Sequence, residues 1–600
     1  MSTSIRSVED HVVRADAVVV DLDRGPAESY AGIRHALLTL RAEGATFGDL
    51  PSRYSSEWAE LFPGEVTGAA RLSDIALAAS ERRLHRESEQ VYRVLSVAAA
   101  ALCAASAELD KTIALRGAGG ADLSSLRGLM LAVERSAITP GARLELVDPT
   151  RVRVPAGPHA DYRAERVRCL NRMGLPVTVG DLSFDLADLP DSGFAPFSEE
   201  GRLYAQAVDA DSARTDRIAA ALAYCRRAFF SANWEGMAIV AKDALGLLRG
   251  LPETAVAEVL TKAERQDGFA DAIEFETVIL RTTADLRAFL LKVLGIQAGF
   301  RGDQDTAIGY FRSMRTAVDG LSPELLAQSH LYTALTLSKR KGQLPDAIAE
   351  VEEGFTAVPA TDGEPDSVRR ERGWLHNLRA LTLFAQKKFT DAFQHEKQAL
   401  ACLEGLGDAS SAHLRINLYS NISVLQEKAG KLTQAHATWD KFRQASGAGN
   451  AAFLKHHAYR SGGIRLLIDE RTEALADLAT TLENAVTLND DFHECEVRLE
   501  VGGLLARSGE SEAAAEQFRL AEIAARRIGD PYHVALAQAG LTVITGEAND
   551  AAGTARRSTS YPAKAAALAD AIGNNAAVLE LLPSPKTKLN RPFDPINFQD

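Results

Sequence analysis

The sequence predicts a mainly α-helical protein: a right-handed α-solenoid of stacked helix pairs, preceded by an N-terminal domain of helices and strands. Composition is the first observation behind this prediction. Aromatic residues make up only 6 % of the chain while alanine is abundant, and small side chains let helices approach closely. The second observation is a motif of glycines and alanines that returns every 39 to 45 residues between positions 289 and 521. A regular interval of this length is typical of repeat architectures.

The clearest copy of the motif covers residues 289–317. Gly295 stands where two helices would cross, and its missing side chain permits a close approach. The pair Gly302-Asp303 has the character of a turn, and Ala307 provides a small contact on the second helix. One copy therefore predicts a helix, a tight turn and a second helix.

Four further good copies and one weaker copy follow. The second-helix alanines are Ala307, Ala347, Ala392, Ala435, Ala474 and Ala514. Ala474 belongs to the weakest copy. With this pattern, residues 285–530 resemble the tetratricopeptide repeat superfamily, in the long-repeat variety found in sensor or scaffold regions of large bacterial regulators. The interval between the second-helix alanines is longer than the usual repeat of about 34 residues, so helices or loops must be lengthened.

The array should extend beyond these copies. Residues 225–248 fit the same template as a degenerate first repeat, so we expect the solenoid to cover 213–550. Residues 551–581 are expected to form capping helices, because a terminal repeat must present a polar face to water. The final segment, 582–600, contains four prolines and should be an extended tail.

The N-terminal domain, residues 1–200, carries no family pattern that we identify. Helical periodicity marks 27–44, 72–109 and 123–136. Short alternating segments predict a small β-containing part near 143–190.

Candidate catalytic residues in this domain are few. Asp21 and Asp23 follow an apolar stretch, as in haloacid-dehalogenase-type phosphotransferases, but Arg24-Gly25-Pro26 stands where that family needs Thr or Val. The glycines of 116–120 lack the lysine of a phosphate-binding loop. The sequence also has no Gly-x-Ser-x-Gly elbow. Binding is therefore favoured over catalysis, and we expect no cofactor.

Histidines and arginines form two further clusters. His456-His457 and His493-Glu494-Cys495 lack partners at metal-ligand spacing, so we expect surface or packing residues and no metal. Salt bridges are the expected role of the arginine cluster, with an anionic ligand or acidic partner as the alternative. Its members are Arg151, Arg153, Arg163, Arg166, Arg168 and Arg172.

Charge and targeting signals limit the partners. The formal net charge is −14 with a pI near 5.5, which disfavours nucleic acid and anionic membranes and suits cationic or neutral segments. The start of the chain lacks the pattern of a signal peptide, and the apolar run 94–105 is too short to span a bilayer. The five cysteines follow no disulfide or zinc motif. We expect a cytoplasmic protein.

The resemblance implies where a partner would bind. In this superfamily helix A lines a concave groove, and its lining places fall on residues that offer cations, amides and aromatic rings. These residues are Lys292, Tyr332, Lys339, Arg340, Trp374, Asn377 and Asn417, with Asn421 adjacent. Such side chains suit the backbone and carboxylates of an extended peptide.

We therefore expect a scaffold or regulator that binds a protein or peptide segment in the groove, with self-association possible. Pro592-Phe593-Asp594-Pro595 or a neighbouring piece of the tail is a candidate occupant, from the same or a second copy. One alternative is an accessory or enzymatic protein of a bacterial biosynthetic or peptide-modification pathway, with chemistry in the first 200 residues. A third is a transcription regulator with a helix-turn-helix between 75 and 140, which the net charge disfavours.

Overall fold

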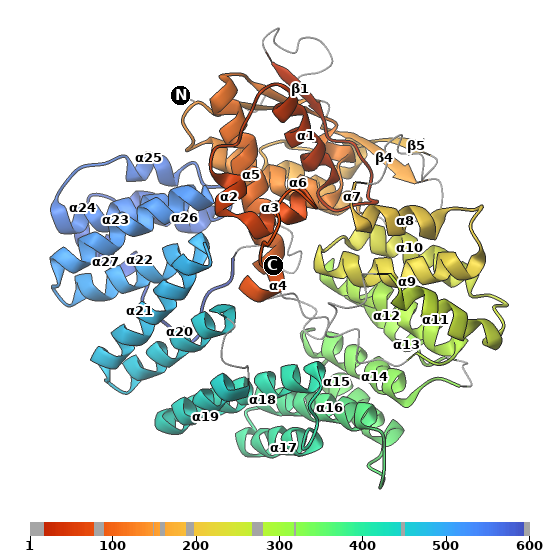
Figure 1. Cartoon of the computed structure of the whole chain (residues 1–600). Coiled ribbons are helices and arrows are strands. Elements are labelled where there is room, and N and C mark those ends of the chain that lie inside the picture. The colour runs from red at the N-terminus through yellow and green to blue at the C-terminus, as the bar shows by residue number, and fades with distance from the viewer. Residues whose placement is uncertain are drawn as a thin grey trace.

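Figure 1 shows a computed structural model of the chain. It describes residues 17–76, 89–147, 149–155, 162–187, 197–266, 280–316, 320–445 and 451–592. These residues are mainly helical, and from residue 199 onward the helices pack as successive pairs. The predicted helical solenoid is confirmed.

The N-terminal domain is built on a three-stranded parallel sheet. Its order is β1 (Val18–Asp21), β2 (Ile113–Arg116) and β3 (Leu144–Val147), with the first residues of the strands aligned. The β structure is therefore not limited to 143–190, because β1 and β2 lie far upstream. Strands of four residues carry too little alternation to be recognised in a sequence.

Helices α1 (Ala31–Ala42), α5 (Glu89–Leu109) and α6 (Leu123–Ser136) pack with this sheet and with one another. Among the described residues, α5 is the one helix long and apolar enough to cross a membrane, with a mean hydropathy of 1.4 in its most apolar window. That window is 78 % buried inside the protein, so α5 serves here as a core helix.

One buried carboxylate joins the starts of α1 and α6. Asp122 caps α6 by accepting from the backbone N–H of Ser125 at 2.8 Å. It also accepts from the backbone N–H groups of Tyr30 and Gly32, each at 3.0 Å. Most of α6 is buried in this packing, so it does not present the exposed recognition helix that a helix-turn-helix regulator requires.

A second, two-stranded parallel sheet follows. It pairs β4 (Arg151–Pro155) with β5 (Ser183–Ala187), and α7 (Arg163–Arg172) lies between them in the chain. The predicted arginine cluster falls here. Arg166 donates to the carbonyls of Gly119 and Ala121 and pairs with Glu235 at 2.7 Å, which is the structural salt bridge expected of it.

The array consists of helices A and B in alternation. Its pairs are α9 (Arg214–Phe230) with α10 (Trp234–Leu247), α12 (Thr283–Phe300) with α13 (Gln304–Ser313), α14 (Pro323–Ser338) with α15 (Leu344–Ala357), α16 (Asp366–Ala385) with α17 (Phe389–Cys402), α18 (Ala409–Lys428) with α19 (Leu432–Ala445), α20 (Ala451–Leu467) with α21 (Arg471–Thr487) and α22 (Asp491–Arg507) with α23 (Ser511–Ile528). Helices α8 (Glu199–Val208) and α11 (Val256–Glu264) flank the first pair.

Small residues hold each pair together. All six second-helix alanines predicted from the repeat are buried with 0 % exposure. In the clearest copy, a β-carbon on Gly295 would overlap the ring of Phe311, and Gly502 stands in the same relation to Phe518. The glycines therefore allow the phenyl rings of the B helices to lie directly against the A helices.

The chain ends in short helices and an extended segment. Helix α24 (Pro531–Thr545) is followed by α25 (Ala551–Ala555), α26 (Pro562–Ala571) and α27 (Asn575–Leu581). Residues 582–592 contain no helix or strand. Most of the tail segment singled out in the sequence, 593–595, lies outside the described residues.

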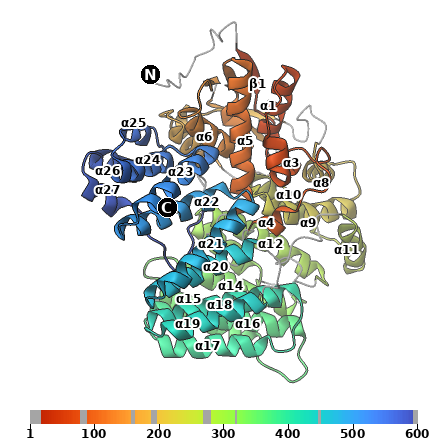
Figure 2. The same cartoon turned by 60° about the vertical axis from the view of Figure 1, so that its left-hand side comes forward.

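Both ends of the array contact the N-terminal domain, as the views in Figures 1 and 2 show together. At the first repeats, Asn233 donates to the carbonyl of Pro26 at 3.0 Å. At the last repeats, Arg135 donates to the carbonyl of Arg527 at 2.5 Å, and Glu134 accepts from the backbone of the segment before α26. The solenoid is thus closed through the N-terminal domain, which brings residues from opposite ends of the chain together.

Candidate functional site

The C-terminal segment 582–592 lies along the A helices α18, α20 and α22. Arg507 on α22 donates to the carbonyls of Leu582 and Pro583 at 3.2 and 3.0 Å. Arg460 on α20 donates to the carbonyl of Thr587 at 2.8 Å. The segment is therefore held by its main chain on the helix-A face, and we call this surface the tail groove.

Two glycines allow the backbone of the tail to touch the helices of the tail groove directly. A β-carbon on Gly463 of α20 would overlap the carbonyl oxygen of Lys586, and one on Gly503 of α22 would overlap that of Pro583. Glycine inside a helix costs about 0.5–1 kcal/mol relative to alanine. Glycine stands at these two positions in spite of that cost, because the tail backbone touches the helices there.

Three side chains of the tail are also recognised. The hydroxyl of Thr587 donates to Glu427 of α18 at 3.0 Å, and the amide of Asn590 donates to Glu496 of α22 at 2.6 Å. Leu589, between them, is only 5 % exposed and belongs to the apolar cluster of the last repeats. The tail groove thus binds a segment through both its backbone and its side chains.

Glu496 is held ionised by its neighbours. His533, on α24, contacts Glu496 at 2.5 Å and Asp530 at 2.6 Å. Burial alone would raise the pKa of Glu496, but the hydrogen bond and charge of His533, together with the hydrogen bond of Asn590, lower it to about 2. Burial would also lower the pKa of His533, yet Asp530 and Glu496 raise it to about 10. The acceptor of the Asn590 amide is therefore a carboxylate across the physiological range.

A second buried acid lies under the middle of the tail. The hydroxyl of Tyr459 donates to Glu500 at 2.7 Å and accepts from the backbone N–H of Lys586 at 3.1 Å. Burial raises the pKa of Glu500 to about 8. At neutral pH the tail backbone is therefore joined to a largely protonated acid through one tyrosine.

The tail groove ends at a buried ionic cluster that joins the array to the N-terminal domain. Lys455 of α20, with 0 % exposure, pairs with Asp490 and lies 3.7 Å from Glu89 of α5. Burial would raise the pKa values of both acids, but Lys455, with His493 beside Asp490, holds them well below their usual range. His493 also contacts the carbonyl of Asn590 at 2.9 Å, so one side chain touches both the cluster and the tail.

Three side chains of the kinds that ligate metal ions meet at the same place. Glu89, His456 and His493 offer ligand atoms within 4.8 Å of one another. However, the ammonium of Lys455 lies 2.9 Å from Nδ1 of His493 and already supplies positive charge there. His456 and His493 belong to a salt-bridged junction, and their meeting with Glu89 was not predicted from the sequence. Burial lowers the pKa of His456 to about 4, so its ring is neutral beside Glu89.

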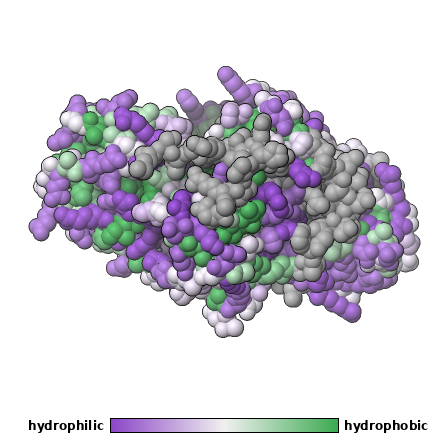
Figure 3. Space-filling view, turned by 90° about the horizontal axis from the view of Figure 1, so that it is seen from above, coloured by the Kyte–Doolittle hydropathy of each residue, from purple (hydrophilic) through white to green (hydrophobic). Residues whose placement is uncertain are grey.

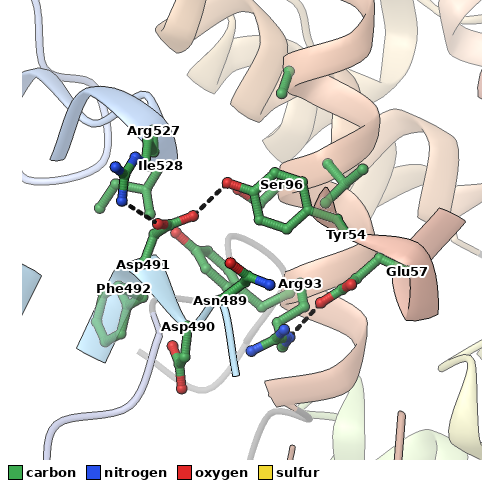
Figure 4. Close-up of a pocket in the computed structure, with 13 residues that line it drawn as sticks. Tyr54, Glu57, Arg93, Ser96, Asn489, Asp490, Asp491, Phe492, Arg527 and Ile528 are labelled. Atoms are coloured by element: carbon green, nitrogen blue, oxygen red, sulfur yellow. Dashed lines mark hydrogen bonds and ion pairs between the residues drawn. The ribbon is translucent and has the colours of Figure 1, made fainter. Parts of the chain in front are cut away.

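A small pocket lies next to this junction (Figure 4). It is lined from the N-terminal domain by residues such as Tyr54 and Arg93, and from the array by Asn489 and Asp491. Tyr54 donates to Asp491 at 2.5 Å, and Arg93 donates to the carbonyl of Leu488 at 2.6 Å. These bonds cross the interface, so the pocket belongs to the contact between domain and array.

The groove residues predicted from the sequence lie mostly upstream of the tail groove. Lys292 is completely buried and donates to Gln328 at 3.3 Å, between α12 and α14. Tyr332 is also buried, and its ring stacks on Phe311. Lys292 and Tyr332 therefore take part in the packing of the helices, and the structure does not expose them to a groove.

Arg340 differs from its prediction, because it lies on the turn after α14 and pairs with Asp305 on α13 at 2.5 Å. It thus contacts a B helix rather than lining the A-helix face. Lys339 precedes it and is partly exposed.

The remaining predicted residues lie on two adjacent A helices. Asn377 of α16 and Asn421 of α18 come together, and the side-chain amide of Asn421 donates a hydrogen bond of 2.7 Å to the side-chain oxygen of Asn377. Trp374 is buried on α16, and Asn417 is partly buried on α18. Since α18 also holds Thr587 of the tail through Glu427, these residues lie on helices that adjoin or form the tail groove.

The sequence predicted that a piece of the tail next to Pro592 docks on the array, but it did not predict the residues that form the tail groove, although a signal for them existed. The doublets Gly462-Gly463 and Gly502-Gly503 occupy the same place in α20 and α22. The first glycine of each doublet packs on its B helix, and the second contacts the tail. The repeat pattern accounts for the first glycine alone, so the second was the unexplained residue.

The acidic pair of the N-terminal domain lies at the end of β1. Asp21 pairs with Arg116 at 3.2 Å, and Asp23 packs so tightly on Gly120 that a β-carbon there would overlap its carboxylate. The residues 116–120 thus form a close turn against these acids rather than an open loop.

Exposed apolar residues are scattered. Phe197, Leu467 and Ile523 are 44 %, 54 % and 48 % exposed, and they lie at distant places in the chain. On the face shown in Figure 3, apolar residues form separate patches among hydrophilic ones. Single exposed apolar side chains of this kind are normal, so the contacts of the tail remain the best-defined recognition surface of the described residues.

Comparisons with known proteins add little. No family model and no curated protein matches the chain. Among solved structures, the Rap conjugation gene regulator of plasmid pLS20, in complex with a peptide, has 11 % identity and a TM-score of 0.29 over 61 % of this chain and 96 % of that chain. A signal-transduction ATPase with a tetratricopeptide repeat sensor from Pyrococcus horikoshii has 12 % identity and a TM-score of 0.37, covering 96 % of each chain. Both likenesses are weak in sequence and in superposition.

The substitution Lys455→Met tests the junction. It leaves Asp490 and Glu89 buried without their cation, and breaking such a pair costs about 3–5 kcal/mol. We expect a loss of this size in the free energy of unfolding, measured in urea. The matched control Lys428→Met, on the exposed end of α18, should change stability little. Equal stability of the two variants would contradict this account of the junction.

The His533 site makes stability depend on pH. Its folded pKa of about 10 exceeds the ordinary 6.5, so its contribution is complete below pH 6.5 and is lost as pH rises towards 10. The whole effect is at most about 4–5 kcal/mol. The difference in unfolding free energy between wild type and His533→Gln should therefore shrink from pH 6 to pH 10. A difference that stays constant or grows would refute the assignment.

The glycine doublets provide a matched pair of substitutions. The double substitution Gly463→Ala with Gly503→Ala should expel the tail, so amide hydrogen exchange at Lys586 should accelerate about tenfold or more. The melting temperature should not fall, because alanine stabilises the two helices relative to glycine. Gly502→Ala, one residue away, should instead lower the melting temperature because its methyl group meets Phe518. Unchanged exchange in the first variant would show that the tail does not need these glycines.

Proposed function

We propose that this protein is a regulatory scaffold that binds extended protein or peptide segments in its tail groove, and that its own residues 582–592 occupy the groove until a partner replaces them. The observation that carries the proposal is the binding mode of the tail. Arg460, Arg507 and His493 contact its main-chain carbonyls, and the glycine doublets admit its backbone. Main-chain contacts of this kind can be made by any extended segment whose side chains also fit the groove.

The position of the groove supports a regulatory role. His493 touches the tail and also the buried cluster that joins α20 and α22 to the N-terminal domain. A ligand can shift an equilibrium only through contacts that differ between two states. Release of the tail removes the contact at His493, which links occupancy of the groove to the domain interface.

We further propose that the binding surface continues along the neighbouring A helices. Asn417 and Asn421 are partly exposed on α18, the helix that holds Thr587 through Glu427, and the buried Trp374 and Asn377 lie on the adjacent α16. Lys339 is the partly exposed candidate on α14. A longer partner would then extend past the end of the tail contacts.

A cytoplasmic location is part of the proposal. The five cysteines are all unpaired, and four of them are buried. Burial raises the pKa of Cys103 and Cys169 to about 12, so these thiols are unreactive packing groups. Free thiols suit a reducing compartment.

A peptide supplied in trans tests the function in the full chain. Leu589→Asp places a charge in an apolar site and should release the tail, whereas Leu581→Asp changes a leucine that is already 38 % exposed. We expect a fluorescent peptide of residues 582–592 to bind the Leu589→Asp variant. It should bind wild type and Leu581→Asp at least about tenfold more weakly, because a tethered tail competes at an effective concentration of about 1 mM.

Two further variants keep this test decisive. Adding Gly463→Ala and Gly503→Ala to Leu589→Asp should abolish peptide binding, because the methyl groups fill the space of the peptide backbone. If Leu589→Asp does not fold, Thr587→Ala with Asn590→Ala removes two tail anchors more gently. Anisotropy that stays flat up to about 1 mM protein with folded, tail-released variants would refute the proposed function.

A further inference from the structure

We propose that the partner presents an extended, cation-rich segment with the pattern Thr-x-Leu-Asn, which the tail imitates. This inference rests on the proposed function and names the class of ligand. Among the described residues, 582–592 are the segment that lies in the groove, so their contacts define what a competitor must match.

The polar anchors of this pattern lie three residues apart. Thr587 donates its hydroxyl to Glu427, and Glu427 is itself paired with Arg460 at 3.0 Å. Asn590 donates its amide to Glu496 and receives the contact of His493 on its carbonyl. Each anchor donates to a carboxylate whose position is fixed by the array. Arg460 holds Glu427, and His533 holds Glu496.

This geometry discriminates between similar side chains. Both anchor sites present carboxylate oxygens, which accept hydrogen bonds but cannot donate them. An Asp in place of Asn590 would bring a second negative charge to within hydrogen-bonding distance of Glu496. A Val in place of Thr587 would leave one acceptor of Glu427 without its hydroxyl.

The leucine between the anchors adds an apolar requirement. Leu589 is 5 % exposed and belongs to the same apolar cluster as Phe492 and Phe518. Burying a leucine side chain is worth about 1.5–3 kcal/mol in transfer free energy. A partner therefore needs a large aliphatic residue between its two polar anchors.

Charge supports a basic partner. Residues 582–592 contain Lys586, Lys588 and Arg591 and no acidic residue, although the whole chain has a formal net charge of −14. Two carboxylates under the tail, those of Glu427 and Glu496, accept hydrogen bonds from it. A cation-rich segment thus meets a chain of opposite charge.

A separate protein is a better competitor than a second copy. The tail follows α27 directly, so its own groove is only a few residues away and the effective concentration of the tail is high. The tail of a second copy would make the same contacts without this advantage. A displacing partner must therefore bring further contacts, for which the surface of α16 and α18 is available in the proposed extension.

The test uses the full-length Leu589→Asp variant and four synthetic peptides in fluorescence anisotropy. The first is LPSPKTKLNRP, the sequence of residues 582–592. The others replace Asn by Asp, replace the three cations by Gln, or scramble the order. We expect the Asp and scrambled peptides to bind at least about tenfold more weakly, because they lose an anchor or the register. The neutral peptide should bind several-fold more weakly and lose most of the salt dependence that the first peptide shows.

The outcomes separate the inference from the function beneath it. If all four peptides bind alike, the pattern is refuted while peptide binding stands. If none binds, the proposed function fails first. Light scattering of the wild type between about 1 and 100 μM decides the source of the ligand: a monomer at all concentrations agrees with a separate partner, and a tail-dependent dimer would assign the groove to a second copy.

Discussion

The ion pairs of Lys455 are the interaction on which the contact between the last repeats and the N-terminal domain depends. The ammonium of Lys455 lies without solvent exposure between Asp490 of the array and Glu89 of the N-terminal domain. An open solenoid needs contacts only between neighbouring repeats. Here a buried charge cluster connects α20 and α22 to α5, and Lys455 helps to hold the pKa values of Glu89 and Asp490 well below their usual range.

This closure gives the tail its place. The A helices α18, α20 and α22 contact residues 582–592 of the tail through Glu427, Arg460 and Arg507. α20 and α22 are also the helices that the Lys455 cluster joins to the N-terminal domain. His493 then belongs to two structures at once, since it faces Asp490 in the cluster and Asn590 in the tail. Occupancy of the groove and attachment of the N-terminal domain are thereby physically linked, as the proposed regulatory role requires.

Sequence reasoning worked where the constraint is local. Ala307 and its five equivalents are completely buried, because a second helix can pack closely only on a small residue. It failed where short segments depend on distant partners. The strand Ile113–Arg116 pairs with strands on both sides that are far away in the sequence, so its four residues carry no independent signal. The same holds for Arg340, whose partner Asp305 is on another helix.

By itself the sequence determined that this is a mainly helical repeat protein with an extended end, because helix periodicity, turn glycines and proline restrictions act over a few residues. The tertiary structure decided which surface is the groove and what lies in it. The repeat pattern does not account for Gly463 and Gly503, and the backbone of the tail that lies against them explains them. That contact joins residues more than 75 positions apart, and only the folded chain brings them together.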